Sequence, residues 1–140
     1  MSNIEFFVKC NPPKTTAQAS SRVFKNKYTG KMFIGKDRRG QSVREELMAL
    51  LRPYVPERIL DGALKITIEF GFPYLKSVRK KDIGKIIPKI TKPDGDNSCK
   101  LIFDCMTRLG FWKDDALLWD IRFRKFYTDT PGIGIKIEKS

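Results

Sequence analysis

The sequence of 140 residues contains no histidine. That absence excludes histidine-based general-base catalysis, Ser–His and Cys–His dyads, and zinc sites with histidine ligands. Cysteine is also scarce, because Cys10, Cys99 and Cys105 form no CxxC pair and leave an odd number. An odd set of isolated cysteines is typical of reduced thiols with no redox role. No apolar run is long enough to span a membrane, and the first residues lack a signal-peptide pattern. We therefore expect a soluble, cytoplasmic protein with no membrane partner.

The charge of the chain is strongly one-sided. Lys and Arg total 28 against 16 Asp and Glu, which gives a net charge of +12. The 41% of hydrophobic residues and 31% of charged residues match a globular domain. A surplus of positive charge attracts polyanions, and nucleic acid is the usual partner for a domain of this size. A generic basic protein and one that docks on anionic membrane are the alternatives, but no basic amphipathic helix of the membrane-surface type is present.

Hydrophobic periodicity predicts a single domain over residues 1–140 with a clear order of elements. The predicted elements are a strand over 4–8, a hairpin with its turn at Thr29-Gly30, a helix over about 42–52, a strand over 64–72, a helix over about 97–109, and a terminal antiparallel hairpin with strands near 119–124 and 133–137. In the first helix Val43, Leu47 and Leu50 form the apolar stripe, and Gly110 stops the second helix. This order predicts an α+β fold, a mixed sheet with two main helices packed on one face. Trp112 and Trp119 are expected in core or hairpin packing.

A basic loop over residues 73–93 separates the predicted central strand from the second helix. Seven bases oppose one acid, Asp82, so the loop carries +6, half of the net charge. The bases are Lys76, Arg79, Lys80, Lys81, Lys85, Lys89 and Lys92. Long loops without hydrophobic periodicity tend to be functional or mobile. We expect this loop to bind nucleic acid and to be mobile without it.

An acidic motif stands directly before the second helix. In extended backbone the carboxylates of Asp94 and Asp96 point the same way, and Gly95 leaves room for a cation between them. Asp96 or Asn97 is expected to cap the helix, whose N-terminus favours phosphate. Lys100, one turn later on the face of Asn97, brings a positive charge close to the carboxylates.

A second acidic pair, Asp114-Asp115, follows the helix and is expected to return to the same site by antiparallel packing. Mg²⁺ takes such oxygen ligands and activates water for attack on phosphate. Each motif alone is more often a turn or a helix cap. A calcium-binding EF-hand is excluded, because Cys99 and Cys105 stand where that loop needs Gly and Glu. The combination favours a metal site, since aspartates are costly beside DNA unless a metal neutralises them. Asp104 is expected to be a surface or helix-orienting group.

These motifs together resemble the RusA family of Holliday-junction resolvases. The resemblance rests on 92–97 (KPDGDN), Lys100, 103–104 (FD), 109–112 (LGFW) and 113–115 (KDD), and it is strong over about 92–126. It implies that Asp94, Asp96 and Asp115 are metal-binding catalytic carboxylates, that Lys100 is the catalytic lysine, and that Asp114 is an auxiliary ligand. It also implies a Mg²⁺ cofactor, with Mn²⁺ as the alternative metal, and no small-molecule cofactor. Family members are homodimers that nick four-way DNA junctions symmetrically and leave 5′-phosphate ends, in recombination and repair.

The resemblance and the charge pattern predict DNA contacts outside the acidic motifs. The candidates are Lys14, Arg22, Lys76, Arg79, Lys80, Lys81, Lys85, Lys89, Lys92, Arg122 and Arg124. A non-catalytic DNA-binding or architectural protein of the same fold is the alternative function, and forks or flaps are alternative substrates. Small basic members of this family often come from phages, so the expected setting is the cytoplasm of a bacterium or of a phage-infected host.

Overall fold

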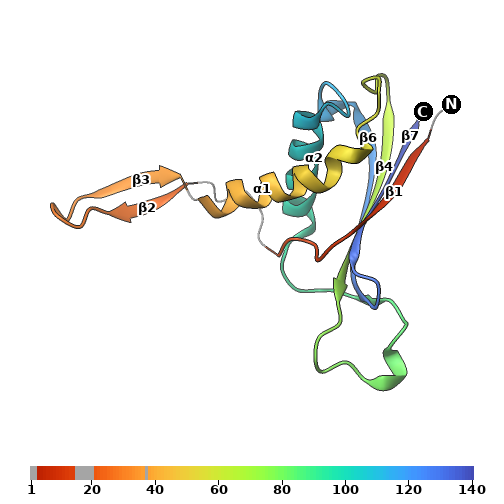
Figure 1. Ribbon diagram of the computed structural model, residues 1–140, viewed down its shortest axis with the longest axis horizontal. Helices are drawn as coiled ribbons and strands as arrows, with labels where there is room; N and C mark the ends of the chain where they lie inside the picture. The colour runs from red at the N-terminus through yellow and green to blue at the C-terminus, as the bar shows by residue number, and fades with distance from the viewer. Residues whose placement is uncertain (1–2, 15–20, 37) are drawn as a thin grey trace.

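The computed structural model describes residues 3–14, 21–36 and 38–140, and the side chains of all these except 21–24 and 33–40. Figure 1 shows a sheet, two helices that lie over one of its faces, and a two-stranded hairpin that projects away from both. The elements in chain order are β1 (Ile4–Lys9), β2 (Ser21–Lys25), β3 (Met32–Lys36), α1 (Arg38–Leu51), η1 (Arg52–Tyr54), β4 (Leu64–Pro73), η2 (Lys80–Asp82), β5 (Ile87–Pro88), α2 (Gly95–Leu109), η3 (Asp115–Leu117), β6 (Leu118–Thr128) and β7 (Gly132–Lys139).

Strand β4 is the centre of the sheet, whose order is β1-β7-β4-β6-β5. It runs parallel to β6 and antiparallel to β7. The strand predicted over 64–72 is confirmed. One of its faces is fully buried and consists of Leu64, Ile66, Ile68, Phe70 and Phe72. The predicted α+β class, with a mixed sheet and two helices on one face in a single domain, is confirmed.

The predicted terminal hairpin is wrong, because β4 lies between β6 and β7. The two strands are therefore about 10 Å apart, two strand spacings, and residues 129–131 are long enough to step across the end of β4. Gly71 of β4 pairs with Gly132 at this crossing. A Cβ added to Gly71 would lie 2.8 Å from Cγ2 of Thr128, so the crossing requires glycine. Strands that follow one another in the sequence usually pair, but here β4 lies between β6 and β7 and pairs with both.

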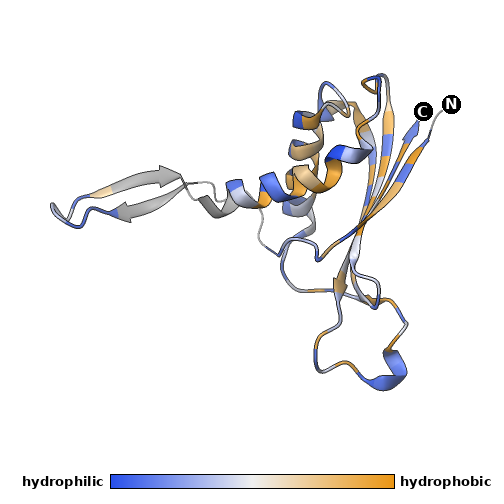
Figure 2. Cartoon of the chain, in the orientation of Figure 1, coloured by the Kyte–Doolittle hydropathy of each residue, from blue (hydrophilic) through white to orange (hydrophobic). Residues whose placement is uncertain are grey.

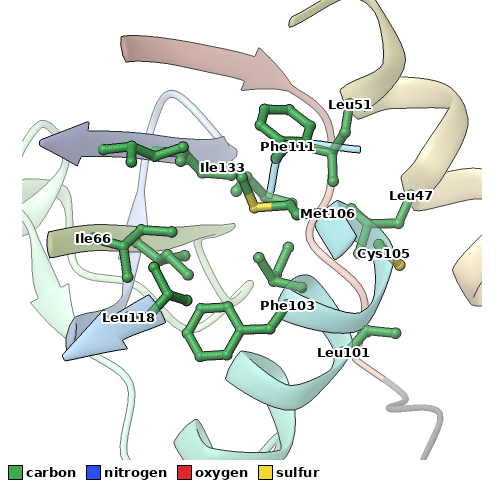
Figure 3. Packing of buried hydrophobic residues seen from close by; sticks show 14 of the residues in the cluster. Leu47, Leu51, Ile66, Leu101, Phe103, Cys105, Met106, Phe111, Leu118 and Ile133 are labelled. Carbon is green, nitrogen blue, oxygen red and sulfur yellow. The ribbon is translucent and has the colours of Figure 1, made fainter. Parts of the chain in front are cut away.

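The core lies between the sheet and the two helices, as Figure 3 shows. Helix α1 begins about a turn earlier than predicted and contributes Leu47 and Leu51, which are 2% and 0% exposed. Leu50, predicted on the apolar stripe, is 37% exposed, because Leu51 takes the inward position one turn after Leu47. Helix α2 ends as predicted, at Gly110 in the left-handed region with a φ of 92°.

The start of β6 departs from the regular alternation of a strand. A register shift between Leu64 and Lys65 of β4 places Trp119 as an extra residue at this bulge. Trp119 is 61% exposed, and its indole N–H donates to Oγ of Ser140 at 2.9 Å. Contrary to the prediction, Trp119 therefore packs neither in the core nor in a β6–β7 hairpin, whereas Trp112, 1% exposed, is in the core.

The basic loop (73–93) is less irregular than its sequence suggests. It contains η2 and the short strand β5, which pairs with β6. Tyr74 closes the first part of the loop, because its hydroxyl accepts from the N–H of Gly84 at 3.0 Å and donates to the carbonyl of Lys85. Figure 2 shows this loop as a mixture of strongly hydrophilic and hydrophobic residues. Its predicted mobility stays a prediction. The predicted N-terminal hairpin is confirmed as β2 and β3, with Phe24 opposite Phe33.

Candidate metal and DNA-binding site

Asp94 occupies the position just before α2, but its side chain does not cap the helix. Its Oδ2 lies 2.9 Å from Nζ of Lys92, and the carboxylate side chain is 46% exposed. The expected cap from Asp96 or Asn97 is wrong, because Asp94 itself stands at the cap position and both later residues are helical. The Asp94 carboxylate is therefore accessible, and an exposed lysine is the ion-pair partner that the structure gives it.

Asp96 lies in the first turn of α2 and is exposed. Since α2 already begins at Gly95, the shared direction expected for two carboxylates on extended backbone does not apply. What the fold provides is two carboxylates within one helical turn. Lys100 is exposed and lies four residues after Asp96, at the spacing that makes side chains neighbours on a helix.

Gly95 has a packing role that the sequence did not predict. A Cβ added there would lie 3.3 Å from Cδ1 of Phe123 on β6, tighter than an ordinary contact. The glycine thus lets the start of α2 pack closely on the ring of Phe123. Its role in leaving room for a cation stays a prediction.

The segment that leads into Asp94 is fixed from the sheet side. We call residues 87–93 the strap. The ammonium of Lys125 on β6 donates to the carbonyls of Thr91 and Pro93 at 2.5 and 2.6 Å, and the N–H of Lys89 donates to the carbonyl of Lys125 at 3.1 Å. Strand β5 begins the strap, and Asp94 follows it directly. A half-buried lysine therefore sets the path of the chain into the acidic motif.

Lys89 is turned inward rather than toward solvent. Its Nζ lies 5.1 and 5.0 Å from the ring centres of Phe72 and Tyr127, and it donates to Oγ1 of Thr91 at 2.8 Å and to the hydroxyl of Tyr127 at 3.2 Å. Hydrogen bonds with Thr91 and with Lys89, and the positive charges of Lys89 and Lys125, lower the pKa of Tyr127 below its ordinary value. The predicted DNA contact Lys89 thus supports the strap.

Asp114 and Asp115 lie beyond the other end of α2. Asp114 caps η3, because its Oδ1 accepts from the N–H of Ala116 at 2.9 Å. Partial burial, a hydrogen bond with Asp114 and the negative charges of Asp114 and Asp104 raise the pKa of the Asp115 carboxyl. The pair is a small acidic patch whose charges repel one another.

The two acidic clusters do not meet within one chain. Helix α2 has 15 residues, so its ends are about 22 Å apart. Asp115 precedes β6, and Figure 1 shows that this strand then runs back along α2 toward the end that carries Asp94. Among residues 3–14, 21–36 and 38–140, no three acidic or cysteine side chains gather closely enough to hold an ion. The expectation that Asp115 returns to the Asp94/Asp96 pair in the same chain is therefore wrong.

Asp104, between these clusters, joins the two helices. Its Oδ2 lies 2.9 Å from Nε of Arg44 on α1 and 3.3 Å from Nε of Arg108 on α2. This placement confirms Asp104 as a helix-orienting group.

Burial and then the charge of Asp96 raise the pKa of Cys99 to about 11, so its thiol stays neutral at physiological pH.

The remaining predicted DNA contacts fall on different surfaces. Within the basic loop the exposed ones are Lys76, Arg79, Lys80, Lys81, Lys85 and Lys92. Lys14 is exposed, and the side chain of Arg22 lies outside the described residues. Arg122 and Arg124 lie on the face of the sheet that the helices leave open, where Arg124 pairs with Glu69. These two arginines are thus on the opposite side of the sheet from Asp94.

The model of the family described as endodeoxyribonuclease RusA matches residues 12–138. The chain belongs to the RusA family. It is also similar to the uncharacterized protein YqaN of Bacillus subtilis (strain 168), with 26% identity over 116 residues, which are 79% of this chain and 81% of that protein. Membership places this chain in a family of DNA endonucleases linked to branched DNA. No helix in the described part of this RusA-family chain is long and apolar enough to cross a membrane.

Sequence reasoning missed two groups of residues of this RusA-family protein. The first is Lys125. The sequence feature that could have identified it is a charge on the same side of β6 as Phe123 and Tyr127. The second group is the turn of the β2–β3 hairpin, where Lys25, Lys27 and Lys31 are exposed. Its signal was the absence of any acidic residue between Glu5 and Asp37.

Proposed function

We propose that the chain is a Mg²⁺-dependent, structure-specific endonuclease that resolves branched DNA, above all four-way junctions, as a homodimer in recombination and repair. Family membership supports DNA cleavage. The observation that carries the metal site is that Asp94 heads α2 without capping it, so its carboxylate is left for another partner. The net charge of +12 supports a polyanionic substrate.

Asp94 and Asp96 would hold the ion, with Asp115 as a third carboxylate. This set fits Mg²⁺, which usually binds through one or two carboxylates and keeps waters and substrate phosphate as its other ligands. When bound, the ion supplies an activated water and neutralises charge on the scissile phosphate. The free N–H groups at the start of α2 and the ammonium of Lys100 attract the phosphate to this end of the helix. Lys92 balances the charge of Asp94 when no ion is bound.

Asp115 reaches this site only from a second copy of the chain. Within one copy the three carboxylates do not gather, and antiparallel pairing of two copies across a two-fold axis would bring each cluster to the other. Such a dimer has two identical sites, which suits paired nicks on a two-fold symmetric junction. Cleavage therefore requires dimerisation, whereas DNA attraction by the basic loop does not.

A cleavage panel tests the proposal. A four-way junction, a fork, a flap and a plain duplex are incubated with the protein in Mg²⁺ or in chelator, and the ends of the products are mapped. The junction is expected to be cut fastest, in paired nicks with 5′-phosphate ends, and only with the metal. Asp94→Asn and Asp115→Asn are expected to bind the junction and leave it uncut.

Asp120→Asn is the matched control, because Asp120 is an exposed carboxylate on β6 outside both clusters. It is expected to cut like the parent. If the parent binds the junction and Mg²⁺ yields no product, the chain is a non-catalytic DNA-binding protein. Full-rate cleavage by Asp94→Asn contradicts the assigned site.

A further inference from the structure

Ile90 is an apolar side chain held out into solvent. It is 92% exposed, although it lies in the strap between β5 and α2 rather than at the tip of a turn. Tyr28, at 97%, is similarly exposed, and it belongs to the turn of the β2–β3 hairpin. A single exposed apolar residue usually needs no explanation. Ile90 differs because the backbone on both sides of it is fixed.

The fixing contacts come from both neighbours of Ile90. The N–H of Lys89 donates to the carbonyl of Lys125, and the ammonium of Lys89 lies over the ring of Phe72. The carbonyl of Thr91 accepts from the ammonium of Lys125. Since both neighbours are bonded on the sheet side, the side chain of Ile90 is turned outward. Isoleucine is branched at Cβ and stiff at χ1, so the strap presents a rigid apolar knob.

The surroundings of this knob are cationic. Lys92 and Lys85 are exposed in the same loop, and the loop carries +6. Asp94 follows four residues later, so their Cα atoms are at most about 14 Å apart. A phosphate at the Asp94/Asp96 end of α2 therefore brings the bases of the same strand within reach of Ile90. The charge selects DNA as the partner, and the apolar surface selects the part of DNA that is not charged, the bases.

We propose that Ile90 is a wedge that packs against a base unstacked at the branch point and so makes the enzyme select branched over continuous DNA. This inference rests on the proposed function. Apolar side chains of this kind open base steps in other DNA-binding proteins, at a cost in stacking. The cost is lowest where bases are already unpaired. A wedge beside the cutting site therefore favours a junction over a duplex, which lysines, reading only phosphate, cannot do.

The test uses the full-length Asp94→Asn protein bound to a four-way junction with 2-aminopurine at the branch. This base fluoresces more strongly when it is unstacked. The parent is expected to raise the fluorescence, and addition of Ile90→Ala is expected to abolish the rise and to lower the junction-to-duplex affinity ratio about tenfold. Ile90→Leu is expected to restore both. Duplex affinity, which the lysines supply, is expected to stay unchanged.

Ile86→Ala is the control, because Ile86 lies in the same loop on the other side of β5 and is 57% exposed. It is expected to behave like the parent. An unchanged fluorescence rise in Ile90→Ala, or an equal loss in Ile86→Ala, overturns the proposal. Thermal melting confirms that each variant is folded. These readouts need no cleavage, so they are independent of the cleavage panel with the unsubstituted chain. If the unsubstituted chain does not cut the junction with Mg²⁺, the endonuclease is refuted, and an Ile90-dependent signal still leaves the wedge standing. A protein that does not bind the junction refutes both.

Discussion

A heterodimer of two inactive variants tests whether the catalytic site is shared between chains. The two variants are Asp94→Asn and Asp115→Asn, each expected to be inactive as a homodimer. Coexpression with two different affinity tags and two purification steps isolates the mixed dimer. In that dimer one site combines Asp94 and Asp96 from one copy with Asp115 from the other, and the second site carries both substitutions.

The structure determines how much cleavage activity the mixed dimer is expected to recover. Mg²⁺ binds oxygen at about 2.0 to 2.1 Å, and among the described residues of one chain no three acidic or cysteine side chains gather closely enough to share an ion. The mixed dimer therefore has one intact site of two and is expected to nick at about half of the parental initial rate. Its products are expected to be singly nicked junctions, because paired cuts need both sites. A labelled junction resolved on native and denaturing gels separates single nicks from paired cuts.

A second mixed dimer supplies the control. Asp94→Asn with Asp96→Asn places one lesion in each site, since both residues belong to the same cluster, and this dimer is expected to be inactive. Activity there indicates contamination by parent chains. An inactive Asp94→Asn/Asp115→Asn dimer that still binds the junction refutes the shared site.

Three further outcomes follow from the geometry. Lys125→Met is expected to loosen the strap, so half-maximal cleavage requires several times more Mg²⁺ in a metal titration, while duplex affinity measured by anisotropy stays the same. Asp115→Asn is expected to raise the melting temperature of the metal-free protein at pH 7. The raised pKa of this carboxyl means that its ionised form destabilises the folded state. The difference in melting temperature between variant and parent is expected to vanish once the carboxyl is protonated, below about pH 4. Replacement of Arg79, Lys80 and Lys81 by Gln is expected to lower the slope of log affinity against log salt by up to about 2.7, at about 0.9 for each DNA phosphate that the loop no longer neutralises, and parallel slopes contradict DNA binding by this loop.

Local patterns in the sequence predicted the elements that local physics determines. The alternation of β4 and the apolar stripe of α2 depend on each segment facing one core, and the stop at Gly110 depends on one backbone conformation. The order of strands did not follow from such patterns, because β4 enters between β6 and β7 through pairing between distant segments. The short connection of residues 129–131 predicted a hairpin, but a connection of this length is also long enough to step across the end of β4.

The acidic residues illustrate the same limit within the site. The motif grouped Asp94, Asp96 and Asp115, and their joint role in an ion site stays a prediction. Their arrangement in space depends on the length and direction of α2, which no motif states. Lys125 was missed because its role depends on hydrogen bonds to the carbonyls of Thr91 and Pro93. Every residue has a backbone carbonyl, so the sequence does not indicate which carbonyls a lysine contacts.

Helix α2 thus separates two requirements of the proposed enzyme. Asp94 stands at its N-cap and Asp96 lies in its first turn, and in the proposed site these two carboxylates hold the ion that receives the phosphate. Its far end leads to Asp115, whose carboxyl pKa is raised by partial burial, by the hydrogen bond with Asp114 and by the charges of Asp114 and Asp104. A helix is too stiff to bring its own ends together, so the carboxylates of one chain remain apart whatever the side chains do. In the proposed enzyme, completion of the ion site would couple cleavage to dimerisation, and a lone copy is expected to bind DNA without cutting it.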